Sequence, residues 1–247
     1  MGRNFKELCN EALELLFYTP VSTFAELDST EGRLVKLKMN NALRTICGGE
    51  QGIWKFRERE KDLYLIGEQK EYPMVDGFIL FIRPDDRTNR IPLLLNQEWQ
   101  YLPLTATGQP IYYWIFKNKI NLFPTPTQEM EGNLHKIRFL TNNFAQDENN
   151  KDKPILELET DEPIIPEIYR SILVYAVCKD FRSSRADAKS EFYRKEYNNL
   201  YNDMLYSQQL TEDYIKGGTV GGYPMSSLSA RVQAFHNPYV QGVPHNG

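Results

Sequence analysis

Residues 108–126, GQPIYYWIFKNKINLFPTP, restrict the possible folds of this chain more than any other stretch. Two runs rich in aromatic and β-branched residues are joined there by the polar pair Lys117-Asn118, which predicts a β-hairpin. Pro124 and Pro126 have no N–H to donate to a strand ladder, so the second strand must end at them. Because the first strand is apolar on both faces, we expect helical segments to cover the hairpin and to make it the middle of a domain.

Amphipathic periodicity predicts four helices in the remainder of the chain. We place them at residues 3–17, 29–48, 166–183 and 185–210. The second helix is expected to open at Asp28, with Glu31 completing a capping box. The third is apolar on nearly all sides, which favours a central position in the fold.

Short apolar runs separated by turn signals predict several strands within residues 52–141. Besides the hairpin, the runs begin at Ile53, Leu63, Phe78 and Leu134, and Tyr72-Pro73 interrupts the series. Such a series is typical of an antiparallel meander or sandwich. The chain is therefore predicted to be an α+β protein, in which helices from both ends of the sequence pack with a central antiparallel β-meander or sandwich.

The overall charge and hydropathy exclude several functional classes. A net charge of −4 and a pI near 5.6 argue against binding of polyanions by the chain as a whole. No apolar run approaches the roughly 18 residues that a membrane helix needs, and the N-terminal residues lack the apolar stretch of a signal peptide. We therefore expect synthesis in a cytosol-like compartment and no contact with a membrane.

The sequence contains no recognisable catalytic or metal-binding pattern. The histidines and cysteines are His135, His236, His245, Cys9, Cys47 and Cys178. None of them has the spacing of a zinc site, and neither a phosphate loop nor a nucleophile elbow is present. Asp85-Asp86 is interpreted as a turn. A glycosidase-type carboxylate pair among the many acidic residues remains an alternative, but the sequence singles out no residue for it. We predict no catalytic residues, no metal and no cofactor, and we expect the cysteines to be buried structural thiols.

Two charged segments are candidates for contacts with partners. Residues 145–163 contain seven acidic residues and two lysines, which predicts an exposed loop that is either solvated or a docking patch for a basic partner. Residues 33–61 contain eight basic and three acidic residues, with Trp54 and Phe56 among them, and form either a solvated surface or one that follows phosphates. The candidate DNA-facing residues are Arg44, Lys55, Arg57 and Arg59.

Residues 217–247 are a C-terminal tail that differs from the core of residues 1–216. The tail has six glycines, three prolines and a single charged residue, Arg231, which predicts a flexible segment. It has no periodicity but carries apolar residues along its whole length, so we expect it to become ordered on a partner. The candidate partner-binding residues are Tyr223, Leu228, Phe235 and Tyr239.

The hairpin stretch also resembles the signature of a known family. Gly108-x-Pro110, the aromatic strand with Tyr113, and Ile120-x-Leu122-x-Pro124-x-Pro126 are similar to the motif of head-to-tail adaptor proteins of tailed bacteriophages, which are also called connector or head-completion proteins. Other features follow in the family's order over roughly residues 5–210: an N-terminal helical pair, Tyr72-Pro73, Pro166-Glu167-Ile168-Tyr169 and a tyrosine-rich last helix.

The resemblance implies a structural virion protein that forms a ring, commonly a dodecamer. Such a ring docks on the portal protein at the capsid vertex, binds tail proteins on its far side and surrounds a channel for the double-stranded DNA genome. The resemblance further implies synthesis in the host bacterial cytoplasm, only transient and non-specific DNA contacts, and no catalysis. The alternatives are a tail-tube or nozzle subunit of a short-tailed phage, an aromatic-rich module that binds nucleic acid or glycan, and a wall-degrading hydrolase.

Overall fold

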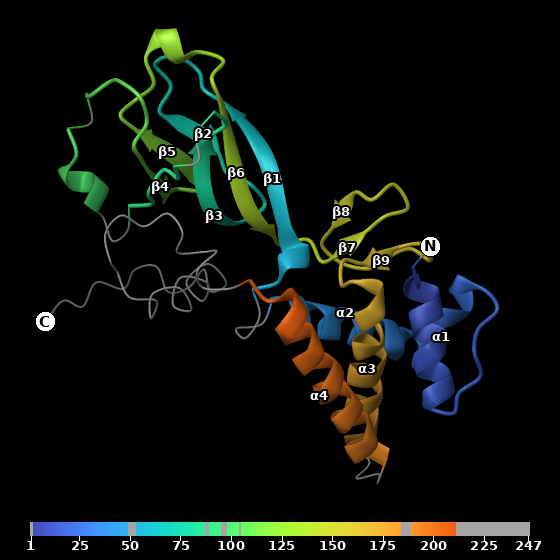
Figure 1. Ribbon diagram of the computed structural model, residues 1–247. Coiled ribbons are helices and arrows are strands. Elements are labelled where there is room, and N and C mark those ends of the chain that lie inside the picture. The colour runs from blue at the N-terminus through green and yellow to red at the C-terminus, as the bar shows by residue number, and fades with distance from the viewer. Residues whose placement is uncertain are drawn as a thin grey trace, which may run out of the picture. The chain divides into compact units, whose positions relative to one another are not determined.

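The computed structural model describes residues 2–48, 53–86, 89–94, 98–103, 105–183 and 189–210. Within these ranges the protein has four α-helices and three small antiparallel sheets, which confirms the predicted α+β class (Figure 1). The described residues divide into two compact units: unit 1 comprises residues 1–57 and 142–210, and unit 2 comprises residues 58–141. The sequence alone did not separate these two units within the predicted core of residues 1–216.

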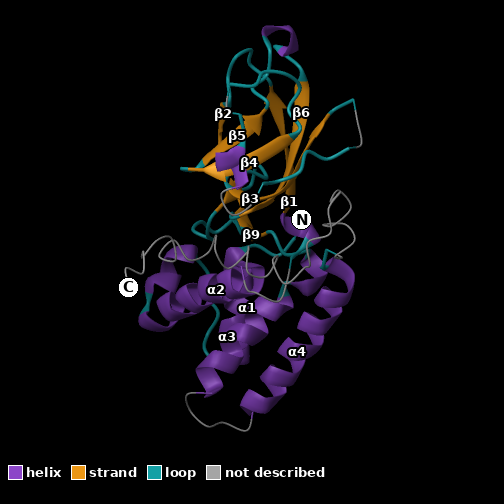
Figure 2. Cartoon of the chain, turned by 90° about the vertical axis from the view of Figure 1, so that its left-hand side faces the viewer, coloured by secondary structure: helices purple, strands orange, loops and turns teal. Residues whose placement is uncertain are grey.

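Unit 1 is organised around helix α3 (Ser171–Ser183). This helix packs against α1 (Phe5–Leu15), α2 (Thr30–Gly48) and α4 (Lys189–Gln208), and α3 and α4 run side by side (Figure 2). Its buried side chains include Ile172, Leu173, Val174, Val177 and Cys178. The predicted central position of the third helix within its unit is therefore confirmed, although a separate 3-10 turn, η5 (Glu167–Tyr169), precedes it.

The start of α2 differs from the predicted capping box. Asp28 is the last residue of a 3-10 helix, η1 (Phe24–Asp28), so it does not cap α2. Ser29 takes that place, because its hydroxyl accepts a hydrogen bond from the backbone N–H of Gly32 at 3.3 Å. The predicted pairing of Asp28 with Glu31 in a capping box is therefore wrong by one residue.

The acidic segment of residues 145–163 folds into a small sheet, whereas the sequence predicted an exposed loop. In this sheet β7 (Ala145–Gln146) lies between β8 (Asp152–Lys153) and β9 (Glu162–Pro163), and both pairings are antiparallel.

A buried carboxylate organises the segment between β8 and β9. Asp161 is inaccessible to solvent, and its Oδ2 accepts hydrogen bonds from the backbone N–H groups of Glu157 at 2.7 Å and Leu158 at 2.8 Å. Lys153 Nζ pairs with the same oxygen at 2.7 Å. Burial alone would raise the pKa of Asp161, but these donors hold its pKa below the ordinary value. Part of the acidity of this segment is therefore used inside unit 1.

Unit 2 consists of two three-stranded sheets, in which β6 lies between β1 and β3, and β5 lies between β2 and β4. The strands are β1 (Glu58–Tyr64), β2 (Glu71–Pro73), β3 (Gly77–Pro84), β4 (Tyr112–Phe116), β5 (Lys119–Phe123) and β6 (Leu134–Thr141). The predicted hairpin is confirmed as β4 and β5. Lys117 and Asn118 have φ values of 49° and 58°, as expected for a tight two-residue turn that follows the twist of the strands.

The two sheets of unit 2 share one hydrophobic cluster, which makes the unit an antiparallel sandwich. Its fully buried members come from both sheets and include Ile82, Tyr113, Ile120, Leu122 and Ile137. This cluster contains no residue of the four α-helices. The expectation that helices cover the hairpin is therefore wrong, because the facing sheet buries its inner side.

Two other strand predictions are corrected. The run at Ile53 does not form a strand, since Trp54 makes one isolated bridge to Gln209 and η2 (Lys55–Arg57) is a 3-10 helix. The Trp54 indole donates a hydrogen bond to the Ile46 carbonyl at 2.7 Å, so this ring belongs to the helical core. Tyr72-Pro73, which the sequence indicated as a break, forms most of β2 at the edge of its sheet, where proline is tolerated.

We expect Asp161→Asn to lower the free energy of unfolding by about 2 kcal/mol, because Lys153 loses its buried partner. Glu157→Gln, four residues away and mostly exposed, should change stability by less than about 0.5 kcal/mol. Urea denaturation at pH 7 measures both. The deficit of Asp161→Asn should shrink as pH falls through the lowered pKa of Asp161, since the wild-type carboxylate is then also neutral. Equal stability of the two variants at pH 7 would contradict this role.

Candidate functional site

The four candidate DNA-facing residues do not gather within one unit. Arg44 and Lys55 lie in unit 1 and are exposed, although Lys55 Nζ donates to the Ser207 carbonyl at 3.2 Å. Arg59 belongs to β1 of unit 2 and is half-buried. The run of basic residues in the sequence is therefore divided between two separate parts of the structure.

Arg57 is buried, contrary to the expectation that it faces DNA. Its side chain is 4% exposed, and its guanidinium donates to the Cys47 carbonyl at 2.6 Å. The same group lies 5.2 Å from the centre of the Phe144 ring. Burial lowers the pKa of Arg57, which nevertheless remains charged at neutral pH. Carbonyls in the last turn of a helix lack intrahelical partners, so Arg57 stabilises the end of α2.

Unit 1 exposes large apolar side chains on its helices. Leu34 and Leu37 lie on neighbouring turns of α2 and line a hollow of about 330 Å³. Ile168 in η5 and Phe192 in α4 are more than half exposed, and Tyr206 in α4 is 98% exposed. Adjoining exposed apolar side chains, such as Leu34 and Leu37, are characteristic of surfaces that associate with other molecules, whereas exposed apolar residues that stand singly are common. We call these five residues the apolar surface of unit 1.

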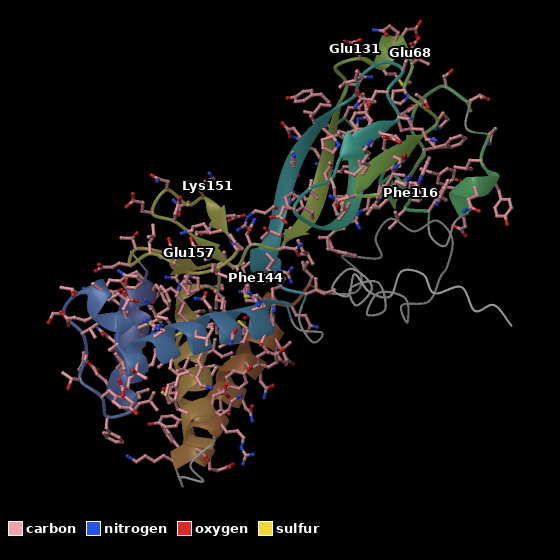
Figure 3. All side chains as sticks on the ribbon, turned by 180° about the vertical axis from the view of Figure 1, so that it is seen from behind. Glu68, Phe116, Glu131, Phe144, Lys151 and Glu157 are labelled. Atoms are coloured by element: carbon pink, nitrogen blue, oxygen red, sulfur yellow. The ribbon has the colours of Figure 1, made fainter. Side chains whose placement is uncertain are left out.

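Unit 2 carries a cluster of aromatic rings beside the hairpin. Trp99, in the 3-10 helix η3 (Glu98–Tyr101), stacks on Trp114, with 5.7 Å between ring centres and 3° between ring planes. Trp99 also contacts Phe116, with 5.2 Å between ring centres, and Tyr101 in the same 3-10 helix is 90% exposed. Phe116 lies at the end of β4, in the hairpin (Figure 3). Lys70 Nζ lies 4.7 Å above the Trp114 ring. We call Trp99, Tyr101 and Phe116 the aromatic surface. Aromatic rings with lysines beside them can stack on the bases of nucleic acids or on sugars.

The sequence did not single out Trp99 or Tyr101, because no periodic pattern links them to the hairpin. Two tryptophans near each other in the sequence were the available signal, but only the tertiary structure places their rings in contact.

A pocket of about 450 Å³ lies wholly within unit 2. Its lining residues are Leu65, Pro84, Asp85, Asp86, Gln109, Met130, Asn133, Leu134 and His135. His135 is 4% exposed, and its ring nitrogens are inaccessible to solvent. Burial lowers the pKa of His135. A hydrogen bond with the Asn133 backbone and the negative charge of Asp86 raise the pKa, but these two effects are smaller than that of burial. The imidazole is therefore neutral at pH 7.

Asp85 and Asp86 follow β3 in a turn, as the sequence indicated, and both line this pocket. No sequence pattern connected them with His135, which is distant along the chain. The alternation of β6, which places His135 and Ile137 on the same face, was the only local signal.

The cysteines have the structural role predicted for them. Cys9, Cys47 and Cys178 are buried and form no disulfide. Burial raises the pKa of Cys9 and of Cys47 to about 12, so these thiols are not nucleophilic at neutral pH. Among the described residues, no group of three or more His, Cys, Asp or Glu side chains is placed to hold a metal ion.

The tail residues Tyr223, Leu228, Phe235 and Tyr239 lie outside the described residues. None of the helices in the described ranges is both long enough and apolar enough to cross a lipid bilayer.

No family model matches this chain, and no curated protein matches it significantly. The resemblance to the adaptor family rests on the sequence motif alone.

We expect Arg57→Ala to lower the free energy of unfolding by about 1–3 kcal/mol, because it leaves the Cys47 carbonyl without its buried donor. Lys55→Ala, two residues earlier and exposed, should change stability by less than about 0.5 kcal/mol. Thermal and urea denaturation measure these effects, and gel retardation of double-stranded DNA measures binding. A stable Arg57→Ala protein with reduced DNA binding would restore Arg57 as a contact residue.

We expect the pH dependence of stability below pH 7 to come partly from His135. Its pKa is lowered in the folded protein, so the unfolded chain binds the proton more readily, and the free energy of unfolding falls as pH drops from 7 to 5. The variant His135→Gln should lose this component, so the two proteins should differ in slope over that range. Parallel stability curves from urea denaturation at several pH values would show that His135 does not titrate in this way.

Proposed function

We propose that this chain is a structural virion protein: a subunit of a ring-shaped head-to-tail adaptor that docks on the portal protein and connects it to the tail of a bacteriophage. The observation that carries the proposal is the apolar surface of unit 1, which provides helical faces suited to association with neighbouring subunits or the portal. The resemblance of residues 108–126 to the motif of the head-to-tail adaptors is the reason for proposing this family.

The motif residues have clear roles in unit 2. Tyr113, Ile120 and Leu122 are in the hydrophobic cluster shared by the two sheets. Gly108 has a φ of +153°, at the limit of a region that side chains disfavour, and its N–H donates to the Thr125 carbonyl at 2.9 Å. The motif residues thus anchor the hairpin in the sandwich of unit 2.

A ring would strengthen contacts that are weak in one subunit. Closed rotational symmetry repeats each contact, so modest affinities multiply through avidity. We propose that Tyr223, Leu228, Phe235 and Tyr239 of the tail are apolar anchors that become ordered on a neighbouring protein, either the portal or a tail component. Fully extended, the tail of 31 residues could reach on the order of 100 Å.

The charge distribution is compatible with a DNA channel. A net charge of −4 avoids tight binding of the genome, which would slow its passage. Arg44 and Lys55 remain exposed in unit 1 and are the proposed sites of transient phosphate contact, together with the half-buried Arg59 of unit 2. A tail-tube or nozzle subunit would use the same features and differ only in its neighbours.

A second candidate function is an aromatic-rich module that binds nucleic acid or glycan. The aromatic surface favours it, because Tyr101 and Phe116 are exposed and Lys117 Nζ lies 5.3 Å from the centre of the Phe116 ring. A monomer whose tryptophan fluorescence is quenched by oligonucleotides or oligosaccharides would support this module over the adaptor.

Native mass spectrometry and negative-stain imaging of the protein, alone and mixed with a portal ring, test the adaptor. We expect ring-shaped assemblies on the portal, even if the isolated subunit is a monomer. A version that ends at Lys216 should keep the circular-dichroism spectrum of the described core but bind at least about tenfold more weakly, because it lacks the apolar anchors.

The matched control keeps the tail at full length and replaces Tyr223, Leu228, Phe235 and Tyr239 with serine. It should fail to assemble in the same way as the truncated protein. If both altered proteins assemble normally, the anchors are not needed. If the intact chain forms no ring with any portal tested, the adaptor proposal is wrong.

A further inference from the structure

We propose that a hollow on α2 of unit 1 binds residues 223–228 of the same chain's own tail while the subunit is free. The hollow has a volume of about 330 Å³ and is lined by Asp28, Thr30, Arg33, Leu34 and Leu37. Such docking takes place in the free subunit, so it does not depend on the adaptor role.

The hollow exposes an apolar area that α2 cannot bury by itself. Leu34 is 40% exposed and Leu37 is 57% exposed, whereas Val35 and Met39 of the same helix are buried in the core of unit 1. An occupant with apolar side chains would remove the two leucines from water, which is favourable. A volume near the lower end of the range for ligand pockets, roughly 300–1,000 Å³, suits one or two inserted side chains.

The lining of the hollow carries no net charge, because it contains one acidic and one basic residue. Lys36 Nζ donates to Asp28 Oδ1 at 2.5 Å, and Arg33 donates to the backbone carbonyl of Asp28 at 3.4 Å. The Asp28 carboxylate therefore already has a cationic partner. The guanidinium of Arg33 has further N–H groups, which can donate to the backbone carbonyls of a bound segment. An uncharged segment with free carbonyl groups would therefore satisfy the hollow.

Residues 217–230 of the tail, GGTVGGYPMSSLSA, have these properties. They include no charged residue, and Tyr223, Met225 and Leu228 provide apolar side chains. Pro224 fixes one backbone angle and so reduces the entropy that is lost on binding. In an extended segment Tyr223 and Met225 point to the same side, roughly 6.6 Å apart, which is close to the roughly 5–6 Å between side chains on neighbouring helical turns. Both side chains can therefore enter the hollow together.

The chain that leads to the tail leaves unit 1 near the end of α2. Leu210, the last described residue, donates its N–H to the Ile53 carbonyl at 2.7 Å. Its neighbour Gln209 bridges to Trp54, whose indole donates to the Ile46 carbonyl in the last turn of α2. The chain beyond Leu210 therefore starts beside the helix that carries the hollow.

The length of this connection matches the distance to the hollow. At roughly 1.5 Å per residue, α2 rises about 18 Å from Leu34 to Ile46. A flexible chain of the 13 residues from 211 to 223 has a root-mean-square length of about 20 Å. A linker whose root-mean-square length equals the span gives the highest effective concentration, on the order of millimolar. The chain's own tail is therefore favoured as the occupant over a separate molecule at micromolar concentration.

Docking of the tail would cover part of the apolar surface of unit 1 before assembly. Leu34 and Leu37 belong to that surface, and they would be uncovered when another protein takes up the tail. The free subunit would therefore expose less apolar area to non-specific association.

The first test records leucine methyl spectra of the full-length protein, in which Leu34→Val and Leu37→Val assign the two signals. We expect both signals to shift in the variant Tyr223→Ser with Met225→Ser, because the Tyr223 ring no longer lies against these methyl groups. The matched control, Phe235→Ser with Tyr239→Ser, removes two aromatic rings further along the tail and should leave the signals in place. Unchanged signals in the first variant, or equal shifts in both variants, would overturn the proposal.

The second test places a photoreactive group in the hollow by the substitution Leu37→p-benzoylphenylalanine in the full-length chain. Trypsin releases residues 217–231 as one peptide, because Lys216 and Arg231 flank it. We expect this peptide to be crosslinked at least about fivefold more from position 37 than from the same group at Asn198, an exposed position of α4. In a mixture of ¹⁴N-labelled and ¹⁵N-labelled chains, the crosslinks should join peptides of one isotope only.

Three results of the crosslinking would contradict docking of the chain's own tail. Equal yields from the two positions would mean non-specific contact, and crosslinks to other parts of the chain would mean a different occupant. Hybrid crosslinks between the two isotopes would mean that the tail comes from a second copy. Both tests use the protein without a portal, so their failure leaves the imaging test of the adaptor role unaffected.

Discussion

The alternation of side chains along β6 is the constraint on which unit 2 depends. Ile137 faces the hydrophobic cluster, while Lys136 and Arg138 face away and pair with carboxylates of β1, including Glu58 at 2.9 Å from Arg138. A shift of one residue in register would bury two charges and expose the apolar side chains, so burial and ion pairing select the same register. That register also places His135 inside the sandwich, at the end where the pocket opens.

The two units present different kinds of surface for recognition. Unit 1 has a helical core around α3 and exposes apolar side chains on α2, η5 and α4. Unit 2 has a sandwich core and presents stacked aromatic rings and an acidic pocket. Each unit has its own hydrophobic core. The apolar and charged groups named above lie outside these cores. These features support a protein that works by contact with other molecules, as the proposed adaptor does.

Charged residues show where inference from sequence has its limits. Residues 33–61 read as one basic segment, yet Arg57 is buried against the Cys47 carbonyl while Arg44 remains exposed. Similarly, Asp161 lies in an acidic segment expected to be solvated, but its carboxylate is enclosed by backbone donors and Lys153. Composition counts charges along the chain, whereas the role of each charge depends on neighbours that the fold brings from elsewhere.

The sequence by itself determined the α+β class, the four helices to within a few residues and the β4–β5 hairpin, because periodicity and turn residues act locally along the chain. It predicted a strand from Leu63, which covers only the last two residues of β1, and it missed the mostly charged residues EREKD that begin this strand and pair with β6. Only the tertiary structure decided that the hairpin is covered by a second sheet, that Trp99 stacks on Trp114 and that His135 shares a pocket with Asp85 and Asp86. Each of these contacts joins different elements of unit 2, and its free energy exists only after the chain has folded.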